Sequence, residues 1–116
     1  MQRRALGLEG EAFASRWYED RGYSIVDRNW RCRQGELDIV ARRGRELVVC
    51  EVKTRSSGRY GTGAEAVDWR KQRTIRQVTA AYLSRSTSGP VSVRFDVAVV
   101  TAGPRGWAID VIEHAF

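Results

Sequence analysis

Three charged side chains in the stretch GELDIVARRGRELVVCEVKTR, residues 35–55, have types and spacing that could do chemistry. Asp38 and Glu51 supply two carboxylates, and Lys53 lies two positions after Glu51. Carboxylate oxygens are hard ligands that suit Mg²⁺. A lysine beside such a cation could stabilise negative charge on a phosphate. The set points to metal-assisted hydrolysis of a phosphodiester.

The stretch has the pattern of two strands joined by a tight turn, which would bring these side chains together. Gly44-Arg45 is the expected turn centre, because Gly followed by any residue suits a two-residue type II′ loop. Asp38 then faces Glu51, and Glu36 faces Lys53, with all four on one side. The positions nearest the turn on that side are apolar, namely Val40, Leu47 and Val49. The opposite side is apolar and comprises Leu37, Ile39, Ala41, Val48, Cys50 and Val52.

This pairing would place two negative charges next to each other. Like charges on facing strand positions destabilise by up to about 1 kcal/mol, and by more if they are desolvated. A divalent cation between Asp38 and Glu51 would remove the repulsion. The alternative is an exposed strand face with a ladder of charged pairs, Glu36–Lys53 beside Asp38–Glu51.

The composition predicts a single domain covering residues 1–116. The chain has 116 residues and 42% hydrophobic content, enough for one core and too short for two domains. Helical and strand periodicities are mixed, which predicts an α/β fold. No apolar run could span a bilayer, and the N-terminus lacks the apolar region of a secretory signal. Cys32 and Cys50 fit no zinc spacing, so we expect a reducing, cytoplasmic location.

Positive charge is concentrated around the candidate residues. The formal net charge is +6. Residues 28–76 contain 13 Lys and Arg against 6 Asp and Glu, a balance of +7, and the other residues have a balance of −1. A basic field around an acidic cluster suits a polyanionic substrate and a catalytic cation. Solubility is the alternative explanation, since many basic chains have no role with nucleic acid.

The first expected helix covers residues 6–21 and would bring another acid toward the hairpin. Its apolar stripe has helical spacing and consists of Phe13, Ala14, Trp17 and Tyr18. Glu11 lies at the edge of this stripe. It is either a third carboxylate leaning toward the site or an acid favoured by the helix dipole in a first turn.

The second expected helix covers residues 64–85, with Ile75, Val78 and Tyr82 as its apolar line. Lys71 lies one turn before Ile75 on that line, at the end nearest a glycine-rich segment. It either reaches the site or extends its apolar stem over the end of the stripe. Arg70 and Arg73 lie on other faces and are candidates for contact with nucleic acid.

Two expected loops combine arginine with an aromatic residue, a composition typical of nucleic-acid contacts. Guanidinium groups bind phosphate in a bidentate fork. The candidates are Arg31 and Arg33 in NWRCRQ, residues 29–34, and Arg55, Arg59 and Tyr60 in TRSSGRYGTG, residues 54–63. Trp30 in the first loop could instead cover the core edge, and the second loop could be a long connection.

The remaining segments are expected to complete a sheet. Strands are predicted at 23–28, 91–101 and 107–112, the last at an edge. Asp96 is either a further site acid or a structural neighbour of Arg94. The predicted order is helix, three strands, helix, two strands, giving a mixed β-sheet flanked by helices.

Several segments together carry a family resemblance. They are GLEGEAFASRW, GYSIVDRNWRCRQGELDIVAR, LVVCEVKTRSSGRYG and AVDWRKQR. An acid on the first helix, then GELDIVA and then EVK resemble the PD-(D/E)xK nuclease superfamily, which includes restriction enzymes and Holliday junction resolvases. Within it, the chain is most similar to the YraN-like family of small endonucleases over nearly its whole length. The resemblance implies a restriction endonuclease-like core.

The resemblance also implies roles for the matched positions. Asp38 and Glu51 would coordinate Mg²⁺ or Mn²⁺, with the Val52 carbonyl oxygen as a further ligand. Lys53 would orient or activate water, and Glu11 would complete the site. Lys71 would occupy the auxiliary basic position of the second helix. The implied activity is hydrolysis of DNA, including branched or damaged DNA. The alternatives are a non-catalytic nucleic-acid-binding module and a nuclease subunit that needs a partner; a homodimer through the strand at 107–112 is one such option.

Overall fold

The described residues of the computed structural model, 3–56, 67–85, 89 and 91–116, form a mixed α/β fold. The element order is helix, three strands, helix and two strands, as the sequence predicts. The elements are α1 (Arg3–Asp20), β1 (Ser24–Cys32), β2 (Gly35–Arg43), β3 (Glu46–Ser56), α2 (Trp69–Ser84), β4 (Ser92–Gly103) and β5 (Gly106–Ile112).

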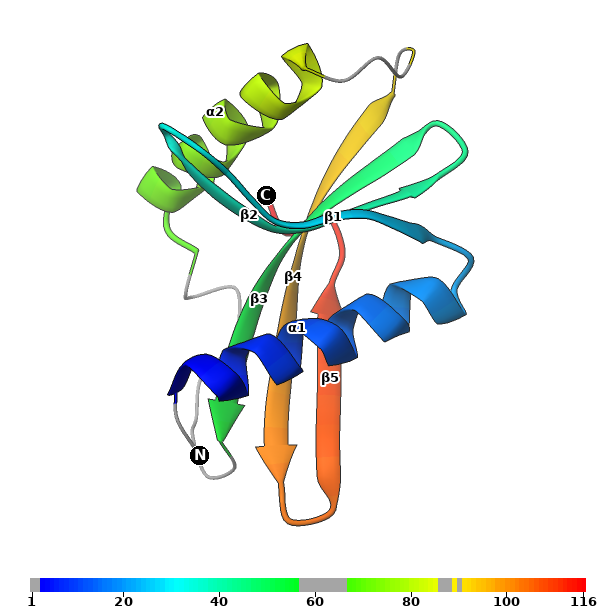
Figure 1. Cartoon of the computed structure of the whole chain (residues 1–116), viewed down its shortest axis with the longest axis vertical. Coiled ribbons are helices and arrows are strands. Elements are labelled where there is room, and N and C mark those ends of the chain that lie inside the picture. The colour runs from blue at the N-terminus through cyan, green and yellow to red at the C-terminus, as the bar shows by residue number, and fades with distance from the viewer. Residues whose placement is uncertain (1–2, 57–66, 86–88, 90) are drawn as a thin grey trace.

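The five strands form one sheet in the order β1-β2-β3-β4-β5. Only β3 and β4 pair in parallel, and the other neighbours are antiparallel. A parallel pair needs a crossover connection, and α2 lies on it. Figure 1 shows α1 crossing one part of the sheet and α2 lying beside the end of the β1–β2 hairpin. β5 is an edge strand, which confirms the prediction for 107–112.

Two apolar clusters cover the sheet, one under each helix. The α2-side cluster contains Ile75, Val78 and Tyr82 of α2 together with Phe95 and Val97 of β4. The α1-side cluster contains Ala14 and Tyr18 of α1 packed on residues of the central strands. The apolar lines predicted for both helices are therefore confirmed. Cys50 is fully buried in the α1-side cluster, as expected.

The β2–β3 hairpin has the predicted turn and register. Arg43 pairs with Glu46, so Gly44 and Arg45 form a two-residue loop. Gly44 has a φ of 60°, and Arg45 is not among the described residues with positive φ, which fits a type II′ turn. The pairing continues as predicted to Ile39 and Cys50.

Beyond Ile39 and Cys50 the two strands separate, which the sequence did not predict. Residues 35–37 of β2 pair only with β1, and β3 continues alone beside β4. Figure 1 shows this fork: the β1–β2 end curves toward α2, and β3 runs on toward the opposite end of the sheet. Leu37 consequently packs in the α2-side cluster, not with Ile39 on the other face, so its predicted side was wrong.

A kink in β1 accompanies the fork. Asn29 has a φ of 53°, a left-handed conformation that Asn tolerates better than most residues. Its neighbours Arg28 and Trp30 pair with Ile39 and Leu37, so Asn29 lies across from Asp38. The bend therefore occurs at the level of the candidate carboxylates.

Three predicted boundaries were wrong. The segment 29–34 is not a loop, because β1 continues to Cys32 and only Arg33 and Gln34 form the turn. Residues 54–56 belong to β3, since the parallel pairing with β4 supports them. Helix α2 begins at Trp69, because the Asp68 side chain caps it by accepting the Lys71 N–H at 3.0 Å. Within the described residues, no helix is long and apolar enough to cross a membrane.

Candidate functional site

The fork between β2 and β3 holds Asp38 against the backbone of β3. The Val52 N–H donates a hydrogen bond of 2.9 Å to Oδ2 of Asp38. This side chain takes the place that a β2 carbonyl would occupy if the ladder continued. Asp38 thus stays beside Glu51 although the strands have parted.

Burial and charge both act on Asp38. Desolvation, followed by repulsion from Glu51, raises the pKa of Asp38 to about 7, although the Val52 N–H acts in the opposite direction. Glu11 and Glu36 add smaller repulsions. The Glu51 side chain is itself only 8% exposed. The two acids form the repulsive pair that the sequence predicts.

Lys71 brings a positive charge to Glu51. Its Nζ lies 2.8 Å from Oε1 of Glu51. Burial lowers the pKa of Lys71, but the hydrogen bond and charge of Glu51 outweigh it and leave the pKa raised. Of the two readings left open for Lys71, the structure therefore shows the one in which its ammonium reaches the fork.

Lys53 lies next to Lys71 on the same side of the sheet. Desolvation, then the hydrogen bond and charge of Lys71, lower the pKa of Lys53, and Glu51 and Asp38 oppose this shift. The fork thus combines two acids with two lysines whose pKa values are shifted in opposite directions.

Glu11 approaches the fork from α1. Gly10 makes this possible, because a Cβ there would lie 2.4 Å from Oγ1 of Thr54 on β3. Burial raises the pKa of Glu11, and the Asn29 side chain opposes the shift. Oε1 of Glu11 is buried and has no hydrogen-bond partner among the described residues. The side chain lines a cavity of about 410 Å³ together with Gly7, Leu8, Asn29 and Arg31.

The oxygen atoms at the fork that could bind a divalent cation belong to the carboxylates of Asp38 and Glu51 and to the Val52 carbonyl. In an extended strand, the N–H and C=O of one residue point to the same edge. The Val52 carbonyl therefore faces the same edge as its N–H, toward Asp38. Among the described residues, no three Asp, Glu, His or Cys side chains are grouped to hold a metal. Glu11 accordingly does not join Asp38 and Glu51 in a three-carboxylate set.

The predicted ladder of charged pairs between β2 and β3 does not form. Glu36 pairs with Arg31 across β1 and β2, and Nε of Arg31 lies 2.8 Å from Oε2 of Glu36. The pairing of β2 with β3 ends before Glu36 and Lys53 would face each other. The Glu36–Lys53 pairing was therefore wrong, because the strands separate there.

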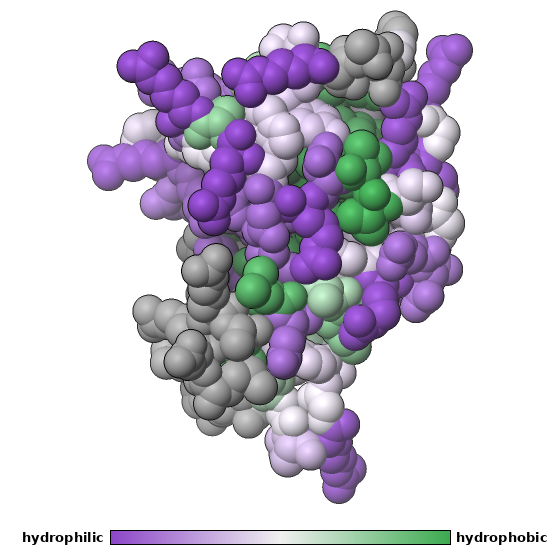
Figure 2. Space-filling view, in the orientation of Figure 1, coloured by the Kyte–Doolittle hydropathy of each residue, from purple (hydrophilic) through white to green (hydrophobic). Residues whose placement is uncertain are grey.

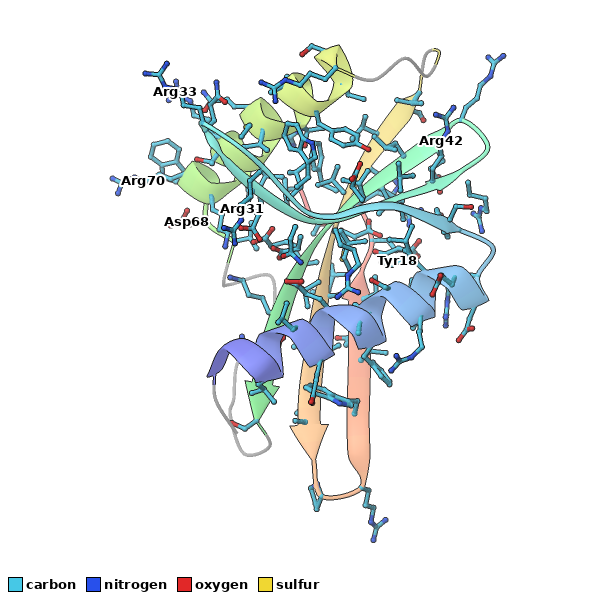
Figure 3. All side chains as sticks on the ribbon, viewed as in Figure 1. Tyr18, Arg31, Arg33, Arg42, Asp68 and Arg70 are labelled. Atoms are coloured by element: carbon cyan, nitrogen blue, oxygen red, sulfur yellow. The ribbon has the colours of Figure 1, made fainter. Side chains whose placement is uncertain are left out.

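Exposed arginines surround one side of the fork. Arg31, Arg33, Arg70 and Arg73 are all exposed. Figure 3 places Arg31 and Arg33 of the β1–β2 end on the same side as Arg70 and Asp68 at the start of α2. Figure 2 shows hydrophilic side chains projecting from this part of the surface.

Other predicted contact residues are placed differently or not described. Arg55 is half-buried on β3, and not on a loop. Arg59 and Tyr60 lie outside the described residues. Asp96 is fully buried against Arg94 and Tyr18, so of its two readings the structural one is confirmed.

The sequence patterns did not single out Asn29 or Trp69. Asn29 adopts a strained backbone conformation and faces Asp38, and only its residue type hinted at this. Trp69 is 65% exposed at the first position of α2. The Asp68 cap could have located that helix start, and with it the exposed Trp69.

Comparison with known proteins gives the family. Residues 10–100 match the family described as uncharacterised protein family UPF0102. The chain belongs to this family. The matched range contains every candidate residue from Glu11 to Lys71.

The relatives match over most of their length. A UPF0102 protein of Frankia alni is 54% identical over 88% of this chain and 85% of its own. A UPF0102 protein of Moorella thermoacetica is 47% identical over 100% of this chain and 98% of its own. A UPF0102 protein of Alkaliphilus oremlandii is 42% identical over 96% of this chain and 97% of its own. The chain is therefore similar in extent to these relatives.

Proposed function

We propose that the protein is a divalent-metal-dependent endonuclease that hydrolyses phosphodiester bonds in DNA, including branched or damaged DNA. The observation that carries the proposal is the convergence at the fork of Asp38, Glu51, Lys53 and Lys71. The resemblance to the PD-(D/E)xK nucleases and their YraN-like members supports the same chemistry.

Asp38, Glu51 and the Val52 carbonyl are the groups that would hold Mg²⁺ or Mn²⁺. A divalent cation bound there would neutralise charge on the phosphate and make water more acidic. Positive charge also favours the ionised form of Asp38, whose pKa is raised to about 7 by burial and by Glu51.

The two lysines would have different roles in the reaction. Lys53, with a lowered pKa, would accept a proton from the attacking water. Lys71, with a raised pKa, would stay charged, hold Glu51 in place at 2.8 Å and add positive charge near the phosphate. The different environments of two neighbouring lysines thus suit one for base chemistry and the other for charge stabilisation.

The exposed arginines would bind the backbone of the nucleic acid on either side of the cut. Arg31 and Arg33 lie at the end of the β1–β2 hairpin, and Arg70 and Arg73 lie on the first turns of α2. Phosphate contacts of this kind release counterions, so binding should weaken steeply with salt.

A cleavage assay tests the proposal. The protein is incubated with linear, nicked, flapped and four-way DNA and with RNA, first in Mg²⁺ and then in Mn²⁺. We expect cleavage of at least one DNA form, and a loss of at least about 100-fold in Asp38→Asn and Glu51→Gln. Asp20→Asn is the matched control, because Asp20 is an exposed acid at the end of α1.

The outcomes separate the candidate functions. Equal cleavage by wild type and Asp38→Asn would identify a contaminating nuclease. Binding without cleavage of any substrate would favour the nucleic-acid-binding module or the subunit that needs a partner. Calorimetry with Mn²⁺ gives an independent readout, since Glu51→Gln should lose most of the heat of binding that wild type shows.

A further inference from the structure

Trp69 is an exposed aromatic side chain that the fold does not use. It is 65% exposed and occupies the first position of α2. We propose that Trp69 stacks on an unpaired base of the nucleic-acid strand whose backbone enters the fork. The proposal deepens the proposed function, because it names strands with unpaired bases as the substrate class.

The helix does not need a tryptophan at this position. Asp68 satisfies the start of α2, since its side chain accepts the Lys71 N–H and its carbonyl accepts the Gln72 N–H at 2.9 Å. Alanine has a higher helix propensity than tryptophan. The Trp69 ring contacts Arg70, whose guanidinium carbon lies 5.3 Å from the ring centroid. Most of the apolar area of the Trp69 side chain is therefore exposed.

The position of Trp69 suits a base that lies a few nucleotides along the strand from the phosphate that is cut. Residues two apart on a helix point to different faces, so Trp69 projects away from Lys71, which points into the fork. A helix with its side chains is about 10–12 Å across. Successive nucleotides rise by about 3.4 Å along a duplex strand. The stacked base would thus belong to a nucleotide a few positions from the phosphate at the fork.

Stacking requires a base whose face is free. In an intact duplex the neighbouring base pairs cover both faces of each base. A single strand, a flap or a gap exposes base faces, and aromatic side chains bind them with little sequence preference. Trp69 would therefore give little to the binding of paired DNA.

The surroundings of Trp69 favour a polyanion over a protein partner. Arg70 is its direct neighbour, and Arg73 lies one turn further on the same side of α2. Among the described residues, the other exposed large apolar side chains are Leu8 and Val26, which lie on α1 and β1. Within the described part of the chain, Trp69 is therefore apart from other exposed apolar side chains and lies beside arginines, whereas protein interfaces have apolar cores depleted of charge.

Binding measured in EDTA tests the inference without cleavage. Fluorescence anisotropy would give the Kd of wild type, Trp69→Ala and Trp69→Phe for a short single strand, a gapped duplex and an intact duplex. Val26→Ala is the matched control, because Val26 is 47% exposed and lies on β1. Gel filtration of each variant records its oligomeric state.

We expect Trp69→Ala to weaken single-strand and gapped-duplex binding by about tenfold. Trp69→Phe should retain most of the affinity, intact duplex should change by less than about twofold, and Val26→Ala should match wild type. Equal loss on paired and unpaired DNA, or no loss on either, would overturn the inference. A changed oligomeric state with unchanged DNA binding would instead assign Trp69 to a protein contact.

Failure of the inference and failure of the proposed function would give different results in the binding and cleavage experiments. Binding of unpaired DNA that depends on Trp69, in a protein that cleaves nothing, would keep the inference and remove the nuclease. Cleavage that depends on Asp38 but binding that ignores Trp69 would do the reverse. A wild-type protein that binds no DNA form would overturn both.

Discussion

Two clusters of charge on the same sheet are built in opposite ways. One is the fork, where Asp38 and Glu51 meet two lysines. The other, here termed the paired cluster, consists of Asp96, Arg94, Tyr18, Tyr23, Glu46 and Glu113. Strand alternation separates them: Cys50 pairs with Asp96 and the adjacent Glu51 pairs with Val97, so Glu51 and Asp96 point to opposite faces.

Every oxygen of Asp96 in the paired cluster has a donor. Oδ2 accepts the Tyr18 hydroxyl at 2.7 Å and Nη2 of Arg94 at 3.0 Å, and Oδ1 accepts Nε of Arg94 at 2.9 Å. The His114 N–H adds a bond of 3.2 Å. Burial lowers the pKa of Arg94, but Asp96 outweighs it and leaves the pKa raised. Asp96 thus favours the charged form of the Arg94 guanidinium.

The fork leaves its charges in conflict. Burial and Glu51 raise the pKa of Asp38 to about 7, and burial and Lys71 lower the pKa of Lys53. Groups held away from their preferred protonation state tend to lie at functional sites. The paired charges of Asp96 and Arg94 serve the fold, whereas the conflicting charges at the fork would be relieved by a ligand of opposite charge.

The largest effect is expected from breaking the paired cluster. Asp96→Asn would leave the buried Arg94 guanidinium without its nearest countercharge, and we expect it to destabilise the protein by about 3 kcal/mol. Urea unfolding followed by circular dichroism measures this loss. Asp110→Asn, at an exposed position of β5, should change stability by less than about 0.5 kcal/mol. Equal urea midpoints for wild type and Asp96→Asn would contradict the structural role.

Neutralising an acid at the fork should increase the stability of the protein, in contrast to Asp96→Asn. Asp38 has a raised folded pKa, so its contribution to stability is fully present below about pH 4 and is lost as pH rises toward about 7. Asp38→Asn keeps an oxygen to accept the Val52 N–H but cannot ionise. We expect it to be more stable than wild type by about 2 kcal/mol near pH 8 in EDTA, and equal near pH 4.

Unfolding midpoints at the two pH values measure this difference. Adding Mn²⁺ at the higher pH should raise the stability of wild type and leave Asp38→Asn unchanged, because a ligand stabilises only the form that binds it. A variant less stable than wild type near pH 8 would show that Asp38 serves the fold and would remove the contrast between the two clusters.

The sequence predicted the parts of the site that depend on local rules. The Gly44 turn determined the hairpin register down to Ile39 and Cys50. The apolar line of α2 placed Lys71 at the end of the stripe, where it could either reach the site or cover the stripe, and its ammonium lies at Glu51. Period and turn chemistry act over a few residues, so they can be read from a single chain.

The sequence could not predict where the strands part or which distant groups pair. Alternation continues unchanged through Asp38, but the ladder ends at Ile39, and nothing in the local pattern marks that point. Tyr18 and Asp96 are 78 positions apart and meet only through packing of α1 on the sheet. The start of α2 was readable from Asp68, but the apolar residues before it favoured an earlier start.

The smallest expected effect concerns the helix that brings Glu11 to the fork. Gly→Ala within a helix normally stabilises by about 0.5–1 kcal/mol. Gly7 has nothing within 4 Å of an added Cβ, so Gly7→Ala should follow this rule. At Gly10 an added Cβ would lie 2.4 Å from Oγ1 of Thr54 and 3.0 Å from Val100, so overpacking should outweigh the gain.

We expect Gly10→Ala to destabilise by about 1 kcal/mol in urea unfolding, with Gly7→Ala as the matched control. Because the clash would push α1 away from β3, it should also move Glu11 away from Asp38 and Glu51. That displacement lowers the repulsion on Asp38, so the pH-dependent stability difference between wild type and Asp38→Asn should shrink in the Gly10→Ala background. An undiminished difference would show that Glu11 acts on the fork too weakly to belong to it.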